Sequence, residues 1–538
     1  MAETKREIER KYDVGAAAAL PDLSGVAGVA DVVDKGVVEL DAVYWDTPDQ
    51  RLAAASITLR RRTGGDDAGW HLKLPVSLAD GVRDEIRAPL SEAVPRALLG
   101  LVRSRVREAE LVPLVRLLSA RDLRHLVDAD GALLAEVSID GVRAERLSGG
   151  TGTAAWAEVE VELADDGDPA LLDKVEKKLR KAGVRRSTAT SKLGRALAET
   201  TPKDPGTKKA RTEGAARSGR KPGKSEAVAD EVRAAVGEGP GTAGDHVLAH
   251  LRAQRDALVG LDPAVRRDLP DSVHQMRVAT RRMRSTFRTY RKILDRTVTD
   301  PVGDELKWLA GELGVDRDQE VLTERLTTRI TALPRTLLLG PVRGRLRIWT
   351  VARRTGSRRR TVAVLEGKRY LALLDAVDTL LTAPPLLPAA AGTPAKELSK
   401  AALKDYARLA ARVEHALELS PGPERDLALH DARKAAKRAR YAGEAATPAL
   451  GEPAKRFAKR MKAVQTVLGD HQDSVVAREA LRALAIQAHL AGESAFTWGL
   501  LYGEEEASGA ARERELPEVW AWASRVKVRA AFRNGTSG

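Results

Sequence analysis

Residues 7–191 consist of short segments in which apolar and polar positions alternate. EIERKYDV, SITLRRRT and WAEVEVELA are examples, and Gly and Asp residues mark the turns between such segments. A period of two is typical of β-strands that have one apolar and one polar face. The pattern therefore predicts a mostly antiparallel β domain, which we place at residues 1–200.

The pattern changes to a period of 3.6 in residues 241–538, where long stretches are rich in Ala, Leu and Arg. This period is typical of helices, so we expect the second domain to be all-α. Residues 201–240 are rich in Pro, Gly, Lys and Ser without a sustained period, which predicts a flexible linker. More than one domain is also expected because 538 residues exceed what one hydrophobic core usually organises. The chain is thus expected to be an α+β multidomain protein.

An internal repeat divides the helical domain. VHQMRVATRRMRSTFRTY from Val273 resembles LHDARKAAKRARYAGE from Leu429. LGVDRDQEVL from Leu313 and LGDHQDSVVA from Leu468 follow the two copies, and we interpret each as a turn at the end of a helix. The sequence predicts two copies of one unit, each extended to about four helices.

Charge is distributed unevenly between these parts. The formal net charge is +14, of which residues 1–200 contribute −4, residues 201–240 contribute +3 and residues 241–538 contribute +15. A basic domain of this size indicates a polyanionic partner. From charge alone the alternatives are nucleic acid, an anionic membrane and polyphosphate.

Cysteine is absent, so the chain has no disulfide, thiolate nucleophile or thiolate metal site. The N-terminal MAETKREIERKYD has no apolar core typical of a secretory signal, and the sequence contains no run of about 18 apolar residues. We therefore expect a cytoplasmic protein without a membrane partner.

Charged residues recur at every second position of several predicted strands, so they share one face of each strand. The sets are Glu7, Glu9 and Lys11; Arg60 and Arg62; His71 and Lys73; Arg83, Glu85 and Arg87; and Glu158, Glu160 and Glu162. A charged face in water explains one such strand, but several of them favour a closed barrel with the charges in its lumen. Unpaired charges are costly to bury, and a bound anion with its counter-cations would remove that cost.

An ordered series of motifs carries a resemblance to a known family. EIERK from Glu7 matches the ExExK signature of the CYTH, or triphosphate tunnel metalloenzyme, family. The similarity continues through TLRRR from Thr58, LKLP from Leu72, EVEVEL from Glu158 and SKL from Ser191. The resemblance implies an eight-stranded antiparallel barrel, or tunnel, that hydrolyses a triphosphate with Mg²⁺ or Mn²⁺ as cofactor.

The resemblance also implies roles for individual residues. The metal ligands would be Glu7, Glu9, Glu158 and Glu160, and the catalytic residues would be Glu7, Glu9 and Lys11. The triphosphate ligands would be Lys11, Arg60, Arg62, Lys73, Arg83, Arg121 and Lys192. Arg116, Arg121 and Arg124 compete for one arginine position of the family, and the sequence does not decide among them.

Basic residues form a stripe on one helical face in each copy of the repeat. His274, Arg277, Arg281, Arg284 and Arg288 follow spacings of three and four, as do His430, Arg433, Lys437 and Arg440. One such stripe is usually a face in solvent, but two at equivalent positions favour a composite basic surface. HQMRVATRRMR from His274 and HDARKAAKRARY from His430 resemble the CHAD family, which is associated with inorganic polyphosphate.

By this resemblance we expect both stripes, together with Lys434, to bind polyphosphate, with His274 and His430 donating hydrogen bonds. Weaker candidates for the same role are Lys307, Arg317, Lys459, Lys462 and His471. The histidines have an alternative role as packed helix residues, and no HxxxH or comparable pair supports a metal site.

Fusion to a polyphosphate-binding domain favours inorganic tripolyphosphate as the substrate of the tunnel. The alternatives are an organic triphosphate, such as thiamine triphosphate or a nucleotide, with adenylate cyclase activity less favoured, and a binding or targeting protein without turnover. Specific nucleic-acid binding is not expected, because the basic stripes lack aromatic stacking residues. A homodimer and a location at polyphosphate granules are further alternatives that the sequence leaves open.

Overall fold

The computed structural model of the chain describes residues 3–15, 20–77, 81–201, 241–354 and 357–534. The chain divides into two compact units, Met1–Ser218 and Gly219–Gly538. The predicted linker, residues 201–240, lies outside the described residues except for its first residue.

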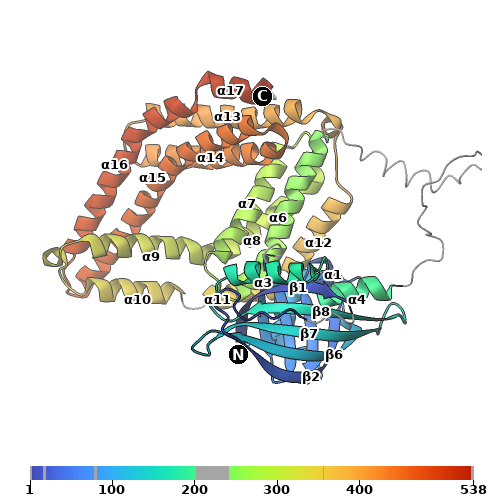
Figure 1. Cartoon of the computed structure of the whole chain (residues 1–538). Coiled ribbons are helices and arrows are strands. Elements are labelled where there is room, and N and C mark those ends of the chain that lie inside the picture. Colours follow the sequence, from blue (N-terminus) through green and yellow to red (C-terminus); the bar gives the residue numbers. More distant parts are fainter. Residues whose placement is uncertain (1–2, 16–19, 78–80, 202–240, 355–356, 535–538) are drawn as a thin grey trace, which may run out of the picture. The chain divides into compact units, whose positions relative to one another are not determined.

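Eight antiparallel strands close into a barrel in the first unit (Figure 1). Each strand pairs with its neighbours in the order β1, β5, β4, β3, β2, β6, β7 and β8, and β8 pairs with β1 to complete the ring. The predicted eight-stranded antiparallel barrel is confirmed. A two-residue strand, β9 (Arg185–Arg186), pairs with the last part of β1. The strands of the ring are β1 (Glu3–Val14), β2 (Asp31–Asp46), β3 (Thr58–Thr63), β4 (Gly69–Ser77), β5 (Val82–Ala88), β6 (Val112–Val127), β7 (Leu133–Arg146) and β8 (Thr153–Leu163).

Where helices cover the outward face of the barrel, that face is apolar. Val159 and Val161 of β8 are fully buried, in one cluster with Val175 of the helix on this side. Fully burying such a side chain contributes roughly 1.5–3 kcal/mol. Since alternate residues of a strand face opposite sides, burial of these valines directs the neighbouring Glu158 and Glu160 into the lumen. Apolar clusters of this kind lie between the sheet and α1 (Arg51–Ala54), α2 (Arg96–Val106) and α3 (Ala170–Lys181), whereas α4 (Lys192–Thr200) packs on apolar residues of the lumen face, such as Val142 and Ala144.

The second unit is built of helices, as predicted (Figure 1). They are α6 (Ala243–Arg266), α7 (Ser272–Thr289), α8 (Arg296–Glu312), α9 (Gly314–Ala332), α10 (Val342–Arg354), α11 (Ser357–Glu366), α12 (Lys368–Thr382), α13 (Pro394–Glu418), α14 (Pro423–Leu450), α15 (Glu452–Leu490), α16 (Phe496–Ala523) and α17 (Val526–Asn534). Short 3-10 helices occur at Arg335–Leu337 and Pro388–Ala391. Among the helices of the described residues, none combines the length and the apolar character that crossing a membrane requires.

The two copies of the repeat differ where a turn was predicted in each. At Leu313 the chain passes from α8 to α9 with a brief interruption, but Leu468 lies well inside the continuous α15, so the turn predicted there is wrong. Val464, Val467 and Leu468 are buried at helical spacing. Their burial outweighs the roughly 1 kcal/mol by which Gly469 disfavours a helix relative to alanine.

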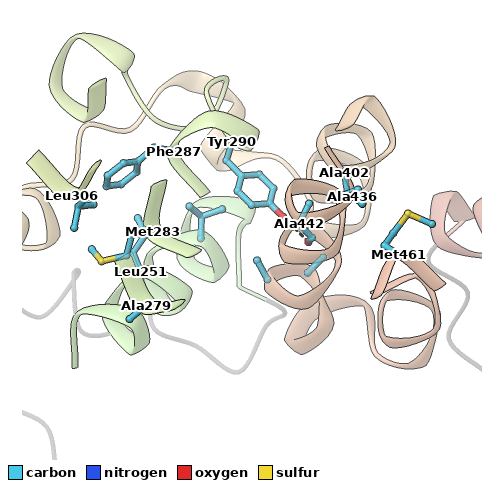
Figure 2. Close-up of a cluster of buried hydrophobic side chains, with 14 of the residues drawn as sticks. Leu251, Ala279, Met283, Phe287, Tyr290, Leu306, Ala402, Ala436, Ala442 and Met461 are labelled. Atoms are coloured by element: carbon cyan, nitrogen blue, oxygen red, sulfur yellow. Dashed lines mark hydrogen bonds between the residues drawn. The ribbon is translucent and has the colours of Figure 1, made fainter. Parts of the chain in front are cut away.

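A shared apolar core fixes α7 against α14. Figure 2 shows Met283 and Phe287 in this core, with Tyr290 reaching toward Ala442. The buried hydroxyl of Tyr290 donates a hydrogen bond to the carbonyl oxygen of Ala442 at 3.1 Å. A buried hydroxyl without a partner would cost roughly 1–3 kcal/mol, so this bond favours one packing of the two helices. The basic stripes, which lie on these helices, are therefore held at fixed positions relative to each other.

Candidate functional site

The barrel encloses a cavity of about 270 Å³ whose lining is almost entirely charged. All eight strands contribute to it, because the register places the charged positions of each strand in the lumen. Lys11, for example, lies opposite Glu160 on the neighbouring strand. The predicted site residues that line the cavity are Glu7, Glu9, Lys11, Arg60, Arg62, Lys73, Arg83, Arg121, Glu160 and Lys192.

One charge network in the lumen is centred on Glu85. Its Oε1 lies 3.0 Å from Nδ1 of His71 and 3.8 Å from Nζ of Lys73. Glu7 Oε2 lies 2.6 Å from the same ammonium group of Lys73. Burial raises the pKa of Glu7 to about 7, against the attraction of Lys73. Burial also disfavours the charge of Glu85, but His71 and Lys73 hold the pKa of Glu85 well below its ordinary value.

A second network surrounds the ammonium group of Lys192 at the start of α4. Its Nζ lies 2.9 Å from Asp140 Oδ2, 2.8 Å from Glu158 Oε1 and 2.5 Å from Glu160 Oε1. Arg121 donates two hydrogen bonds to Asp140, at 2.7 and 2.9 Å. Burial disfavours the charge of Asp140, yet Lys192 and Arg121 keep its pKa below the ordinary value. Lys192 thus contacts all three converging carboxylates, and Arg121 pairs with two of them as well.

Lys11 joins this second network to Glu9. Its ammonium group contacts Glu160 and lies 3.2 Å from Glu9 Oε1. Burial opposes ionisation of Glu9, but the charges of Lys11 and Lys73 lower the pKa of Glu9 to about 2. The backbone of Glu9 is held by Gly81, where an added Cβ would lie 2.0 Å from the Glu9 carbonyl oxygen. Glycine is therefore required at the position that fixes Glu9.

Asp140, Glu158 and Glu160 have the donor set of a site for a hard divalent cation. All three are buried, and one oxygen of each lies within 4.8 Å of the others. Carboxylate oxygens are the ligands that Mg²⁺ and Mn²⁺ prefer. The ammonium group of Lys192 brings positive charge to this point, as expected for buried carboxylates that converge. These residues therefore fit a divalent metal.

The acidic and basic side chains of the whole lining are nearly equal in number. A triphosphate carries several negative charges, so the anion alone would leave the closed lumen strongly negative. Divalent cations that enter with the anion would keep the charges balanced, because buried charge is tolerated only when it is paired. The lumen thus suits an anion that is bound together with cations.

The predicted metal ligands fall into two groups in the structure. Glu158 and Glu160 belong to the carboxylate cluster, whereas Glu7 and Glu9 are paired with lysines elsewhere in the same lumen. Asp140 completes the cluster and was missed by the sequence reasoning. Its signal was present in AEVSID, where the alternate positions of a strand place Asp140 on the polar face.

The structure also separates the three arginines that competed for one tunnel position. Arg121 lines the cavity. Arg116 pairs with Asp41 at 2.6 Å with 44% of its side chain exposed, and Arg124 pairs with Asp122 at 3.0 Å with 36% exposed. Positions 116 and 124 differ from 121 by an odd number of residues, so their side chains take the other face of β6.

Two predicted triphosphate ligands, Arg83 and Arg62, differ in their surroundings. Arg83 donates a hydrogen bond at 2.5 Å to the carbonyl oxygen of Thr190, two residues before Lys192, and so helps to position Lys192. Arg62 is buried, and burial together with the charge of Arg60 lowers the pKa of Arg62 to about 9. An anion bound here would stabilise the charged form of Arg62.

Two further residues beside the predicted ligands were given no individual role by the sequence, although His71 was placed on the charged face of its strand. Tyr44 lies opposite Arg60 and accepts a hydrogen bond from it at 3.3 Å. His71 is 1% exposed and bridges Glu85, at 3.0 Å, and the backbone oxygen of Asp67, at 2.9 Å. Burial lowers the pKa of His71 to about 4, so the imidazole is neutral near pH 7. His71 therefore orients Glu85 rather than adding charge to the lumen.

In the helical unit, the two basic stripes meet between α7 and α14. Burial, followed by the charges of Arg433 and Arg281, lowers the pKa of Lys437 to about 8. Asp473 supplies the opposing charge, 3.6 Å from Arg433. Cations from both predicted stripes are therefore close enough to repel one another, and an anion would relieve this repulsion.

The remaining candidates of this unit are placed as follows. His430 is half-buried, and burial together with the charge of Lys434 lowers the pKa of His430. Its Nδ1 is buried without a hydrogen-bond partner in the described structure. His274 and Arg277 are also half-buried, and Arg440 pairs with Glu444 at 3.2 Å. Lys307, Lys459 and Lys462 are exposed, and the side chain of Arg317 lies outside the described residues.

His471 is placed differently from the other candidates. It is 2% exposed, and its Nε2 lies 3.3 Å from Asp426 and 3.2 Å from Glu513. Two carboxylates at this distance disfavour a phosphate at the same nitrogen. We therefore correct its assignment from a phosphate ligand to a packed helix residue with acidic partners.

Comparison with known proteins matches both halves of the chain. The CYTH domain matches residues 5–197 and the CHAD domain matches residues 249–482. The protein Rv2226 of Mycobacterium tuberculosis is 38% identical over 532 residues, which covers 95% of each chain. The chain belongs to the CYTH–CHAD family. Both resemblances predicted from the sequence motifs are thereby confirmed.

Two solved structures are similar to parts of this CYTH–CHAD protein. PptA from Streptomyces chartreusis is 24% identical with a TM-score of 0.44, over 52% of this chain and 99% of that chain. The CHAD domain from the plant Ricinus communis is 22% identical with a TM-score of 0.42, over 53% of this chain and 93% of that chain. CYTH tunnel enzymes depend on divalent metals, and the carboxylate cluster of this CYTH–CHAD protein fits such an ion.

Proposed function

We propose that the barrel hydrolyses inorganic tripolyphosphate with a divalent metal and that the helical domain binds inorganic polyphosphate. One observation carries the first part: a closed lumen gathers phosphate-binding cations and a cluster of three carboxylates around one cavity. Members of the CYTH family are triphosphatases or cyclases, which supports chemistry at a phosphoanhydride bond.

In the proposed reaction, Asp140, Glu158 and Glu160 hold Mg²⁺ or Mn²⁺, which when bound would withdraw charge from the phosphates and activate a water molecule. Lys73 and Arg60 bind phosphate oxygens through charge-assisted hydrogen bonds and orient the chain along the lumen. The closed strands exclude bulk water. Basic side chains therefore stabilise the charge that develops on the leaving diphosphate more strongly than they would in water.

The lining supports an inorganic substrate over an organic one. Among the described residues that line the cavity, none is aliphatic, and Tyr44 supplies the aromatic surface. Sites for drug-sized organic groups are usually lined by apolar and aromatic side chains, which a nucleobase or a thiazole ring would require. A chain of phosphates can be bound by charged groups alone. Thiamine triphosphate and nucleotides therefore stand as the second candidates.

A substrate panel tests the enzymatic part. The full chain would be given tripolyphosphate, ATP, thiamine triphosphate or long-chain polyphosphate, each with Mg²⁺, Mn²⁺ or EDTA, and released phosphate would be measured. We expect the highest kcat/KM for tripolyphosphate and no release in EDTA. Faster turnover of an organic triphosphate would refute the proposed substrate. No release under any condition would support the alternative of a binding protein without turnover.

For the helical domain, the proposal rests on basic side chains that crowd together on two packed helices. Lys437, Arg433 and Arg281 lie close enough for their charges to disfavour one another. A flexible polyanion of closely spaced phosphates could bind several such groups at once and release their repulsion. We also retain the expectations of a cytoplasmic location and of granule association as proposals that follow from this ligand.

Competition binding tests this second part. Labelled long-chain polyphosphate bound to the full chain in EDTA would be displaced with unlabelled polyphosphate, DNA or RNA at fixed salt. We expect polyphosphate to compete at the lowest concentration of charged groups. Stronger competition by DNA or RNA would show that the basic helices serve a nucleic acid instead.

A further inference from the structure

A second polar cavity, of about 320 Å³, lies in the helical unit where the basic stripe of α7 ends. Six arginines from separate elements line it: Arg284, Arg288, Arg291, Arg296, Arg408 and Arg438. The first two belong to the stripe of α7, and the others come from the segment after α7 and from α8, α13 and α14. We call this cavity the arginine pocket.

Part of the arginine pocket is held in place by a buried carboxylate. Asp405 is 2% exposed and accepts hydrogen bonds from Arg408 and from the hydroxyl of Thr289, both at 2.6 Å. By contrast, Arg284 and Arg288 make no hydrogen bond or ion pair within the described residues. The pocket therefore combines fixed guanidinium groups with unpaired ones, an arrangement that favours an anionic ligand.

The arginine pocket also contains two carboxylates of α8, which a site for a fully ionised anion would not need. Asp300 pairs with Arg296 at 2.7 Å. Asp304 is exposed and has no ion pair within the described structure, although its charge acts on Arg284. A carboxylate in a phosphate site is favourable only if the ligand can donate a hydrogen bond to it.

The phosphates of a polyphosphate chain differ in this respect. An internal phosphate group has lost its single acidic proton near neutral pH. A terminal phosphate has a second ionisation, with a pKa of about 6 in phosphate monoesters, and so still carries a P–OH group part of the time. Only the terminal phosphate can donate a hydrogen bond to Asp304 while its other oxygens accept hydrogen bonds from the arginines.

The position of the pocket agrees with this distinction. Stripe residues follow α7 turn by turn to Arg288, and the helix ends at Thr289. Phe287, which lines the pocket, faces the apolar core near Leu306 (Figure 2). A chain bound along the stripe would therefore reach the pocket at the end of the basic surface.

We propose that the arginine pocket binds the terminal phosphate of a polyphosphate chain, with Asp304 accepting a hydrogen bond from its P–OH group. The inference rests on the proposed polyphosphate binding and adds recognition of the chain end to it. A chain anchored in this way would lie along the stripes in one direction.

Blocking the chain ends tests the inference. Long-chain polyphosphate whose terminal phosphates have been converted to morpholidates carries neither a P–OH nor an N–H donor at its ends but keeps the internal phosphates. Binding of blocked and unblocked chains to the full protein would be compared in EDTA at about pH 6, where the terminal group is partly protonated. We expect unblocked chains to bind roughly tenfold more tightly, the effect of about one hydrogen bond to a charged group.

Variants locate the source of this preference. Asp304→Asn and Arg291→Gln should reduce the preference for unblocked chains to threefold or less, whereas Lys292→Gln, which removes an exposed charge beside the pocket, should leave it unchanged. Equal binding of both chains to the unaltered protein would overturn the inference while leaving polyphosphate binding itself intact. The inference would also be overturned if both pocket variants kept the full preference for unblocked chains. The chain ends would then be bound elsewhere, such as in the tunnel. Failure of both chains to bind would refute the proposed polyphosphate function and the inference with it.

Discussion

Lysines and arginines gather both in the barrel lumen and on the basic surface formed by the stripes of α7 and α14. The two regions differ in how these positive charges are balanced. In the lumen, most basic groups have a carboxylate near them, as Lys73 has Glu7 at 2.6 Å. On the helical surface, Lys437 is surrounded mainly by other cations, and its pKa falls to about 8.

This difference indicates two ways of binding phosphate. The lumen is complete only when an anion and cations enter together, because either one alone would leave buried charges unbalanced. Among the described residues, the helical surface has no comparable set of carboxylates, so we expect it to take a polyanion without metal. Catalysis by a metal-dependent route is therefore expected in the barrel, and retention of phosphate chains in the helical domain.

The largest effect is expected from Lys192→Met, which removes the ammonium shared by three carboxylates. Loss of one partner from a buried ionic network costs roughly 3–5 kcal/mol, so the barrel should unfold at lower denaturant concentration in EDTA. Mn²⁺ or Mg²⁺ should restore part of the stability, since a bound cation would compensate the carboxylates. The exposed Lys35→Met serves as the control. Destabilisation that divalent metal leaves unchanged would argue against a metal site in this cluster.

Hydrolysis should depend on the same cluster. We expect Glu160→Gln to lower kcat/KM for tripolyphosphate by at least about 100-fold, because even residues that only support metal ligands contribute 10–100-fold. The exposed Glu145→Gln on β7 should keep the activity of the unaltered protein. Phosphate release measured for both variants at saturating Mn²⁺ provides the comparison. Near-normal activity of Glu160→Gln would exclude this carboxylate from the reaction.

A smaller effect is expected on the helical surface. The double variant Arg281→Gln and Lys437→Gln should weaken binding of long-chain polyphosphate about tenfold and reduce its dependence on salt, since two phosphate contacts are removed. The double variant Lys400→Gln and Lys404→Gln, which removes two exposed lysines of α13 outside the stripes, is the matched control. Equal weakening by the control would show that overall charge, and not the stripes, determines affinity.

The smallest effect concerns pH. With its pKa lowered to about 8, Lys437 is charged below that pH and loses its proton as the pH rises through it. Affinity for polyphosphate should therefore fall about threefold between pH 7 and pH 9. Lys437→Arg should remove the decline, because arginine stays protonated over this range. A decline of the same size in Lys437→Arg would assign it to another group.

Closure of the barrel could be predicted from the sequence because the charged positions recur on many strands. A single strand such as Glu7–Lys11 is compatible with a solvent-exposed face, but a whole ring of such faces is stable only around a shared lumen. The choice between Arg116, Arg121 and Arg124 could not be predicted in the same way. It depends on the pairing register of β6, which contains irregularities near Tyr44 and Asp34.

Other parts of the site depended on contacts between distant residues. Asp140 lies in an ordinary strand pattern, and only its approach to Glu158 and Glu160 gives it a role. His471 was a weaker candidate for binding polyphosphate, but the packing of α15 places it beside Asp426. The local sequence places Asp140 on the polar face of its strand, but it does not show which distant residues Asp140 and His471 contact.

Parallel titration of the full chain with Mn²⁺ tests the central claim most directly. Phosphate release from tripolyphosphate and retention of labelled long-chain polyphosphate would be followed in the same samples, starting from EDTA. We predict retention at every metal concentration, and release that is absent in EDTA and rises with Mn²⁺. Release that persists in EDTA, or retention that requires Mn²⁺, would contradict the division between a metal-dependent lumen and a metal-independent surface.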